Sequence, residues 1–118
     1  MIKRSEMQKI ASEYTDPKIG VLGSHSALEI MDGAKDEDFE TMVFCQKGRE
    51  VPYQRFSRIA DEIKIVNKFK DMASPANQKI MRDKNTIIVP HRSLTAYLGY
   101  DILENKLKVP IFGNRKLF

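Results

Sequence analysis

The sequence predicts a single α/β domain, built as a parallel sheet of about five strands with flanking helices. Short apolar runs of strand length alternate along the chain with longer amphipathic segments. This alternation is typical of parallel strands joined by right-handed helical crossovers. The chain has 118 residues, which is enough for one compact domain and too few for two ordinary ones.

Five short apolar runs are the expected strands, and each is bounded by Gly, Pro, Asp or Asn. They cover residues 19–22, 42–45, 63–66, 87–89 and 109–112. The last run contains Pro110, which has no N–H group to donate to a central ladder, so we expect it at a sheet edge or at the start of a strand. The common strand order 3-2-1-4-5 would place the first and fourth strands side by side.

Helices are expected between these strands, and one more is expected before them. The predicted helices cover residues 5–14, 27–34, 75–82 and 93–98. Ser26 and Glu29 have the spacing of a capping box at the start of the second helix. Ser74 followed by Pro75 is a typical start for the third helix, and Gly99 is suited to end the fourth.

The composition is that of a globular protein outside the membrane, with 42% hydrophobic and 31% charged residues. No apolar run approaches the roughly 20 residues that a membrane span requires. Residues 1–14 mix charges throughout, unlike a signal peptide. A single cysteine, Cys45, excludes an internal disulfide and suits a reducing compartment, so we expect a cytoplasmic protein.

The charge distribution favours a small anionic ligand over nucleic acid. The net charge of +4 comes from 20 basic and 16 acidic residues spread along the chain, and aromatic residues make up only 8%. His25, His91 and Cys45 do not have the spacing of metal ligands, so no metal site is expected. Cys45 ends an apolar run and is interpreted as a small buried hydrophobe.

The two histidines fall where an open parallel sheet binds ligands. Such ligands lie beyond the carboxyl ends of the strands, at the point where the strand order reverses. The first strand is followed by Gly-Ser-His-Ser at residues 23–26, and the fourth by Pro-His-Arg-Ser at residues 90–93. We therefore expect a ligand between these two loops.

The residue types in the two loops favour an anion. Gly23 allows a close backbone approach, and a helix that starts after Ser26 directs free N–H groups and partial positive charge towards the same place. The candidate ligand contacts are His25, Ser93, Ser24, Ser26 and Arg92. Other roles remain open, because Ser26 can simply cap the helix, Arg92 can face solvent, and His91 can support its loop.

Several motifs, in the same order over nearly the whole chain, resemble an archaeal family of purine biosynthesis. They are residues 22–28, 33–35, 47–49 with Tyr53 and Phe56, 89–91 with Ser93, Tyr97 and Gly99, and 109–110 with 112–115. The family is that of the formate-dependent ligases of the ATP-grasp superfamily, which use ATP to formylate aminoimidazole carboxamide ribonucleotide and so serve IMP biosynthesis.

The resemblance implies that residues 1–118 are the N-terminal Rossmann-like domain, which binds the ribonucleotide. His25 matches the family's substrate-contacting histidine and Ser93 its substrate-contacting serine. Arg92 stands where the family usually has glycine, so it would either crowd the substrate or add an anion contact. The ATP and magnesium sites are implied to lie in the ATP-grasp region, outside this chain. The isolated chain is therefore expected to be inactive, without catalytic residues or a cofactor of its own.

Two other function classes stay open beside this one. The first is a stand-alone module that binds a phosphorylated metabolite and catalyses nothing. The second is an assembly domain that docks onto a partner or onto another copy of the chain, which the apolar tail at residues 116–118 suggests.

Overall fold

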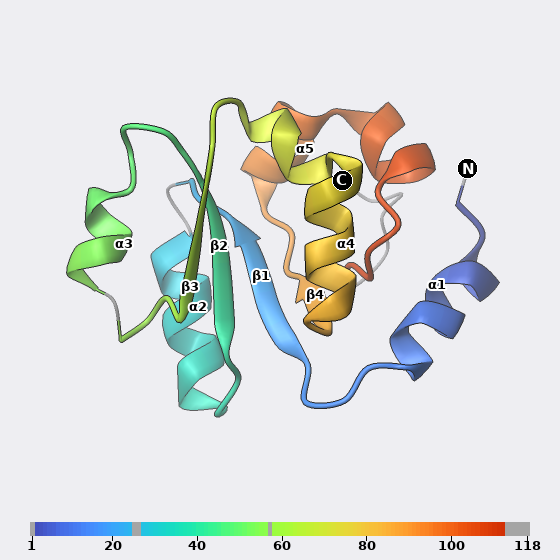
Figure 1. The fold of residues 1–118 in the computed structure, drawn as a ribbon, viewed down its shortest axis with the longest axis horizontal. Coiled ribbons are helices and arrows are strands. Elements are labelled where there is room, and N and C mark those ends of the chain that lie inside the picture. The colour runs from blue at the N-terminus through green and yellow to red at the C-terminus, as the bar shows by residue number, and fades with distance from the viewer. Residues whose placement is uncertain (1, 25–26, 57, 113–118) are drawn as a thin grey trace.

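Four parallel strands form the sheet at the centre of the part of the chain that the computed structural model describes, residues 2–24, 27–56 and 58–112 (Figure 1). The strands are β1 (Lys18–Leu22), β2 (Thr41–Gln46), β3 (Glu62–Val66) and β4 (Thr86–Ile88). Their order is β3-β2-β1-β4, and all pairs are parallel. The predicted α/β class and the predicted pairing of the first and fourth strands are therefore confirmed.

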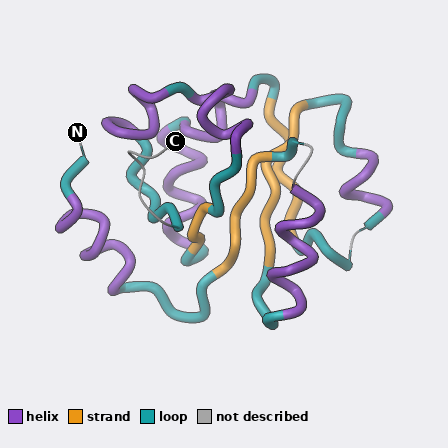
Figure 2. Tube along the Cα trace, turned by 180° about the vertical axis from the view of Figure 1, so that it is seen from behind, coloured by secondary structure: helices purple, strands orange, loops and turns teal. Residues whose placement is uncertain are grey.

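Different helices cover the two faces of the sheet (Figures 1 and 2). Helices α2 (Ala27–Asp36) and α3 (Val51–Arg55) lie on one face. The 3-10 helix η1 (Phe69–Ala73), α4 (Pro75–Asp83), α5 (Arg92–Leu98) and the π-helical turn η2 (Ile102–Lys106) pack on the other side. The crossover from β3 to β4 thus changes face, and the strand order reverses between β1 and β4.

Most of the buried apolar residues in the described ranges form two clusters, one on each side of the sheet. Strand β2 contributes to both, because successive side chains of a strand point to opposite faces. Met42 and Phe44 belong to the cluster under α4, whereas Val43 and Cys45 belong to the cluster under α2. Cys45 is completely buried, as expected for a small hydrophobe, and this burial raises the pKa of its thiol.

The expected fifth strand is shorter than predicted. Residues 109–112 make one parallel bridge, between Ile111 and Ile88, beside β4 at the edge of the sheet. The N–H of Ile88 donates to Pro110 O at 2.9 Å, and the N–H of Phe112 donates to Ile88 O at 2.8 Å. The location agrees with the predicted order, and a longer ladder is disfavoured because Pro110 has no N–H to donate.

All four predicted helices are confirmed, with each end within two residues of the predicted one. Helix α1 (Arg4–Ser12) covers the N-terminal prediction, and none of its residues is buried. Helix α4 begins as predicted, with Ser74 Oγ accepting the N–H of Asn77 at 3.2 Å. Helix α5 ends before Gly99, which has a positive φ of 83°. Helix α2 begins at Ala27, and the predicted cap, Ser26, lies outside the described residues.

Three short elements were not predicted from the sequence, namely α3, η1 and η2. Each spans five residues, which is too short for helical periodicity to identify. In the described ranges, the helices are too short and too polar to cross a membrane.

Candidate functional site

The carboxyl ends of β1 and β4 are joined by a side-chain hydrogen bond. Nε2 of His91 lies 3.0 Å from the carbonyl oxygen of Leu22, the last residue of β1, although the two residues are 69 positions apart in the sequence. Because a carbonyl oxygen only accepts, the ring nitrogen is the donor. The two loops that the sequence analysis assigned to a ligand therefore lie next to each other at the point where the strand order reverses.

The first loop is held by the backbone of β2 and by its own turn. The N–H of Gly23 donates to Phe44 O at 2.7 Å, and the N–H of Ser24 donates to Leu22 O at 2.8 Å. A Cβ atom at position 23 would lie 2.9 Å from Phe44 O and 3.0 Å from Cys45 Cβ. Gly23 is thus required by its close approach to β2, and not only by any approach to a ligand.

The second loop leads directly into α5. The N–H of Val89 donates to Gly20 O at 2.9 Å, which extends the pairing of β4 with β1. The N–H of Leu94 donates to His91 O at 3.0 Å, which closes the first turn of α5. Arg92 and Ser93 lie in this turn, so the backbone of the second loop is placed at the predicted edge.

Of the five predicted ligand contacts, the structure describes the side chain of Ser24 alone. Ser24 lies in the described part of the first loop, beside the bond between His91 and Leu22. His25 and Ser26 lie outside the described residues, as do the side chains of Arg92 and Ser93. Their assignment as ligand contacts therefore stays a prediction.

Two helices begin at this edge of the sheet. Helix α2 begins at Ala27 and α5 at Arg92, so both helices start at the same edge. The first N–H groups of a helix lack intrahelical partners and carry partial positive charge. An anionic ligand at this edge stays a prediction.

Tyr97 of α5 packs against another aromatic side chain, a contact that was not predicted from the sequence. Tyr97 is 42% exposed and packs on the buried ring of Phe69, with ring centroids 4.4 Å apart and planes tilted by 47°. Tyr100 and Phe112 are also exposed. The contact between Tyr97 and Phe69 joins α5 to η1, and the sequence carried no local signal for it.

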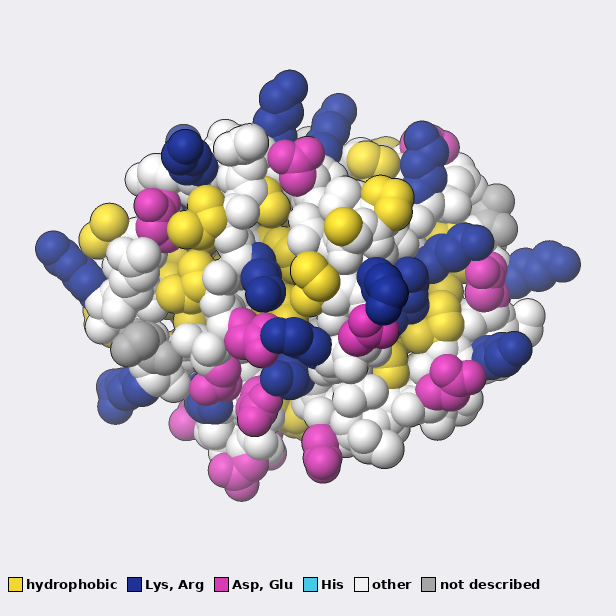
Figure 3. Space-filling view, viewed as in Figure 1, with side chains coloured by type: hydrophobic (Ala, Val, Ile, Leu, Met, Phe, Trp, Pro, Cys, Tyr) yellow, Lys and Arg dark blue, Asp and Glu magenta, His cyan; other side chains and the backbone are white. Residues whose placement is uncertain are grey.

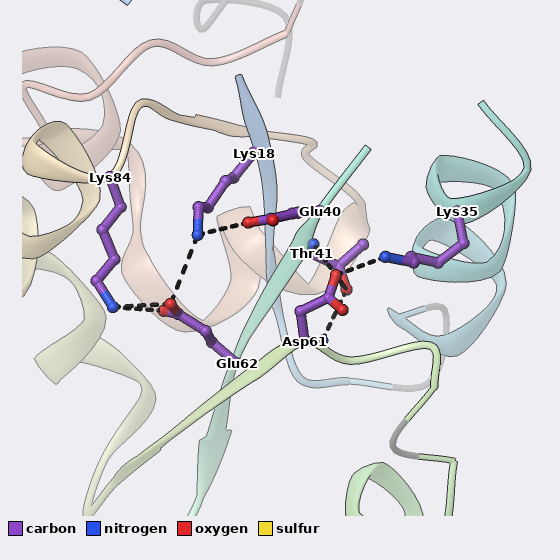
Figure 4. Close-up of polar contacts among 7 residues, drawn as sticks. All are labelled: Lys18, Lys35, Glu40, Thr41, Asp61, Glu62 and Lys84. Carbon is purple, nitrogen blue, oxygen red and sulfur yellow. Dashed lines mark hydrogen bonds and ion pairs between the residues drawn. The ribbon is translucent and has the colours of Figure 1, made fainter. Parts of the chain in front are cut away.

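A second polar cluster lies at the opposite edge of the sheet, where the strands begin (Figure 4). Lys18 Nζ is 2.7 Å from Glu40 and 3.6 Å from Glu62, and Lys84 Nζ is 2.8 Å from Glu62. Burial raises the pKa of Glu62, but the bond from Lys84 and the nearby positive charges outweigh this effect and lower the pKa overall. The two lysines and two glutamates balance one another, so the cluster offers no excess charge to a ligand.

Asp61 forms a related cluster at the same edge (Figure 4). One of its carboxylate oxygens accepts from Lys35 Nζ at 2.7 Å and from the N–H of Thr41 at 2.9 Å. The hydroxyl of Thr41 donates to the carbonyl oxygen of Ile59. These bonds tie the start of β2 to the turn before β3, and the sequence pattern gave no indication of them.

A groove of about 480 Å³ lies between α1 and the end of α4. Its lining residues are Ile10, Glu13, Tyr14, Arg82, Asp83, Asn85 and Lys108. Arg82 donates to Lys108 O at 3.1 Å, and Lys108 Nζ is 3.2 Å from Glu6. Burial raises the pKa of Tyr14 to about 12, against the opposing charge of Arg82. The cations of this groove already have partners, and the groove lies at the edge where the strands begin, away from the two loops. It is therefore not the predicted site.

One face of the molecule carries side chains of both charge signs. Figure 3 shows basic and acidic side chains mixed over the face that α4 covers, with small apolar groups between them. Mixed charge does not create the single-sign field that attracts a polyanion. Over the ranges that the structure describes, no three His, Cys, Asp or Glu side chains are grouped as a metal ion would require.

Comparison with known proteins identifies relatives of the whole chain. It is 48% identical over 118 residues to the 5-formaminoimidazole-4-carboxamide-1-(beta)-D-ribofuranosyl 5'-monophosphate synthetase of Methanobrevibacter smithii, a match that covers 98% of this chain and 32% of the relative. It is 49% identical to the synthetase of the same name from Methanothermobacter thermautotrophicus, with the same coverage. The chain therefore spans about a third of the length of the curated relatives it matches.

A solved structure has the same fold. The crystal structure of an IMP biosynthesis protein PurP from Thermococcus kodakaraensis superimposes with a TM-score of 0.66 and 32% sequence identity, over 83% of this chain and 30% of that chain. The resemblance to the purine-biosynthetic ligases that the motifs indicated is thus confirmed. A family model described as "Protein of unknown function (DUF1246)" matches residues 19–118. The chain accordingly belongs to the DUF1246 family and is homologous to the N-terminal third of the archaeal synthetases.

Proposed function

We propose that this chain is the ribonucleotide-binding domain of an ATP-dependent ligase that formylates aminoimidazole carboxamide ribonucleotide with formate. The bond between His91 and Leu22 carries this proposal, because it joins the two loops in which the family resemblance locates the substrate contacts. The relatives from two methanogens are named as synthetases of the formylated ribonucleotide, which supports the same substrate.

The proposed contacts are His25 in the first loop and Ser93 in the second. Ser24, Ser26 and Arg92 are further candidates around them. The monophosphate of the ribonucleotide is an anion, and it suits an edge at which α2 and α5 both begin. In this role the domain fixes the orientation of the substrate, which by itself accounts for a large share of the rate in group-transfer reactions.

ATP and magnesium are assigned to the remainder of the ligase and not to these residues. Magnesium at such sites is held by one or two carboxylates together with the phosphates of the nucleotide, and the family resemblance places these parts in the ATP-grasp region. Residues 1–118 are therefore proposed as the substrate domain of a cytoplasmic enzyme, without a catalytic residue of its own. An ATP-grasp region would supply the acyl-phosphate chemistry.

The test is calorimetric titration of the chain with aminoimidazole carboxamide ribonucleotide and, in parallel, with the nucleoside that lacks the phosphate. We expect the ribonucleotide to bind, and the substitutions His25→Ala and Ser93→Ala each to raise its Kd about tenfold, as the loss of a charge-assisted hydrogen bond predicts. Lys79→Ala, on the exposed face of α4, is the matched control and should leave Kd unchanged.

Turnover by the full-length ligase separates this proposal from its rivals. His25→Ala should lower kcat/KM there as well, because the same contact orients the reacting amine. Unchanged affinity and unchanged turnover in that variant would contradict the assignment of His25. Binding without any formylation by the full-length protein would favour the binding module instead.

A further inference from the structure

We propose that His91 is a positioning residue, whose ring fixes the first loop of the site relative to the second. The ligand in this inference is the ribonucleotide, so the expected effect on binding rests on the proposed function. The hydrogen bond between His91 and Leu22 is independent of that function. His91 would act through the backbone of Leu22 and not by contact with the substrate.

The geometry of the bond indicates that the His91 ring fixes the turn after β1. Leu22 is completely buried at the end of β1, and its carbonyl oxygen lies 3.0 Å from Nε2 of the half-buried His91 ring. The same oxygen accepts the N–H of Ser24 at 2.8 Å. A carbonyl oxygen has two lone pairs, so these two donors satisfy it fully. His91 and the turn at Gly23 thus share one acceptor atom, and a shift of the ring would shift the turn.

The backbone of His91 holds the other loop. Its carbonyl oxygen accepts the N–H of Leu94 at 3.0 Å, which closes the first turn of α5. Arg92 and Ser93 lie between these two residues. One residue therefore fixes the first loop with its ring and the second loop with its carbonyl, so the separation between Ser24 and positions 92–93 depends on it.

A site that holds one ligand from two loops is sensitive to the distance between those loops. Binding contacts lose much of their strength when one of them is misplaced by about 1 Å. The effect should therefore appear in the affinity for the ribonucleotide more than in the stability of the core. Leu22 O keeps the N–H of Ser24 in any variant, so the property that matters is the side-chain N–H of residue 91, which alone links this oxygen to the second loop. Two variants of similar size, one with a donor and one without, therefore test the inference.

The variants are His91→Gln, whose amide keeps a donor at a comparable reach, and His91→Leu, which keeps the bulk without a donor. In the 118-residue chain, we expect His91→Leu to raise the ribonucleotide Kd about fivefold to tenfold, and His91→Gln to recover most of the affinity. Amide hydrogen exchange, followed by NMR without ligand, should show faster exchange at Ser24 in His91→Leu only. The amide of Val43, in the centre of β2, should keep its protection in both variants.

Equal weakening by Gln and Leu, or full affinity in His91→Leu, would overturn the positioning role. The exchange measurement separates this result from failure of the proposed function. If the wild-type chain does not bind the ribonucleotide, the proposed function fails. Faster amide exchange at Ser24 in His91→Leu would still show that the His91 ring fixes the first loop. Unchanged exchange at Ser24 would overturn this role.

Discussion

The side-chain oxygen of Gln78 accepts the backbone N–H of Lys108 at 2.9 Å. The NH₂ group of the same amide donates to Ala73 O at 2.8 Å and to Lys106 O at 3.0 Å. Gln78 is only 8% exposed and lies in α4, whereas residues 107–109 have no regular secondary structure. One amide on a helix therefore supplies hydrogen bonds to the segment that leads to the bridge at Ile111.

Replacement of Gln78 by Met should lower the free energy of unfolding by about 2–3 kcal/mol, because it removes three part-buried hydrogen bonds to backbone groups, each worth about 1 kcal/mol. Urea denaturation followed by circular dichroism measures this loss. Gln54→Met, on the exposed surface of α3, is the matched control and should change stability by less than about 0.5 kcal/mol. Equal losses in the two variants would show that the amide of Gln78 is not what holds the segment.

Gly23→Ala should destabilise the protein by about 1–3 kcal/mol, because its Cβ would lie 2.9 Å from Phe44 O. The same change at Gly33, in the exposed part of α2, meets no atom within 4 Å and should stabilise by up to about 1 kcal/mol. Thermal unfolding of both variants measures the two effects. A neutral Gly23→Ala variant would mean that the loop moves away from β2 at little cost.

The strands could be predicted because each has a local signal in the sequence. Buried parallel strands are short, continuous apolar runs, and β2 is buried from Thr41 to Cys45. The order followed from a topology rule, and it placed the loops after β1 and β4 together. The prediction was wrong about the length of the fifth strand, where Pro110 limits the ladder to one bridge.

The contacts that hold the site could not be predicted, because each joins a side chain to a distant backbone group. The bond from His91 to Leu22 and the bonds of Gln78 depend on which atoms face each other after folding. Residue type and spacing do not tell which side-chain and backbone atoms meet in the folded chain. From the sequence, His91 could be a support for its loop or a ligand contact. The hydrogen bond of its ring to Leu22 O favours the support.

Thr86→Val should stabilise the protein by about 1 kcal/mol. The hydroxyl of Thr86 is completely buried and has no hydrogen-bond partner in the described structure, so an isosteric methyl group removes an unpaid desolvation cost. Thr41→Val is the matched control, since this equally buried hydroxyl donates to Ile59 O and accepts the N–H of Asp61 at 3.1 Å. It should destabilise by about 1–2 kcal/mol. Chemical denaturation of the two variants would contradict the argument if both changed stability in the same direction.

The contact between Glu62 and Lys84 should make stability depend on pH in the acidic range. The interactions of Glu62 lower its pKa in the folded state below the ordinary value of 4.5, although burial opposes them. The unfolded state then binds more protons near and below that pH, so this contribution is complete above 4.5 and is lost as the pH falls through the folded pKa. Glu62→Gln should therefore cost about 1 kcal/mol at neutral pH and less in acid.

Lys84→Met provides the control for this prediction, because it removes the first of the interactions that lower the pKa of Glu62 while leaving the carboxyl group and Lys18 in place. An NMR titration of the Glu62 side chain should then give a higher pKa than in the wild type. Urea denaturation at several pH values should show that the difference between wild type and Glu62→Gln shrinks as the pH falls. A difference independent of pH, with an unchanged pKa in Lys84→Met, would mean that solvent screens the pair and that the cluster at the start of the strands contributes through packing alone.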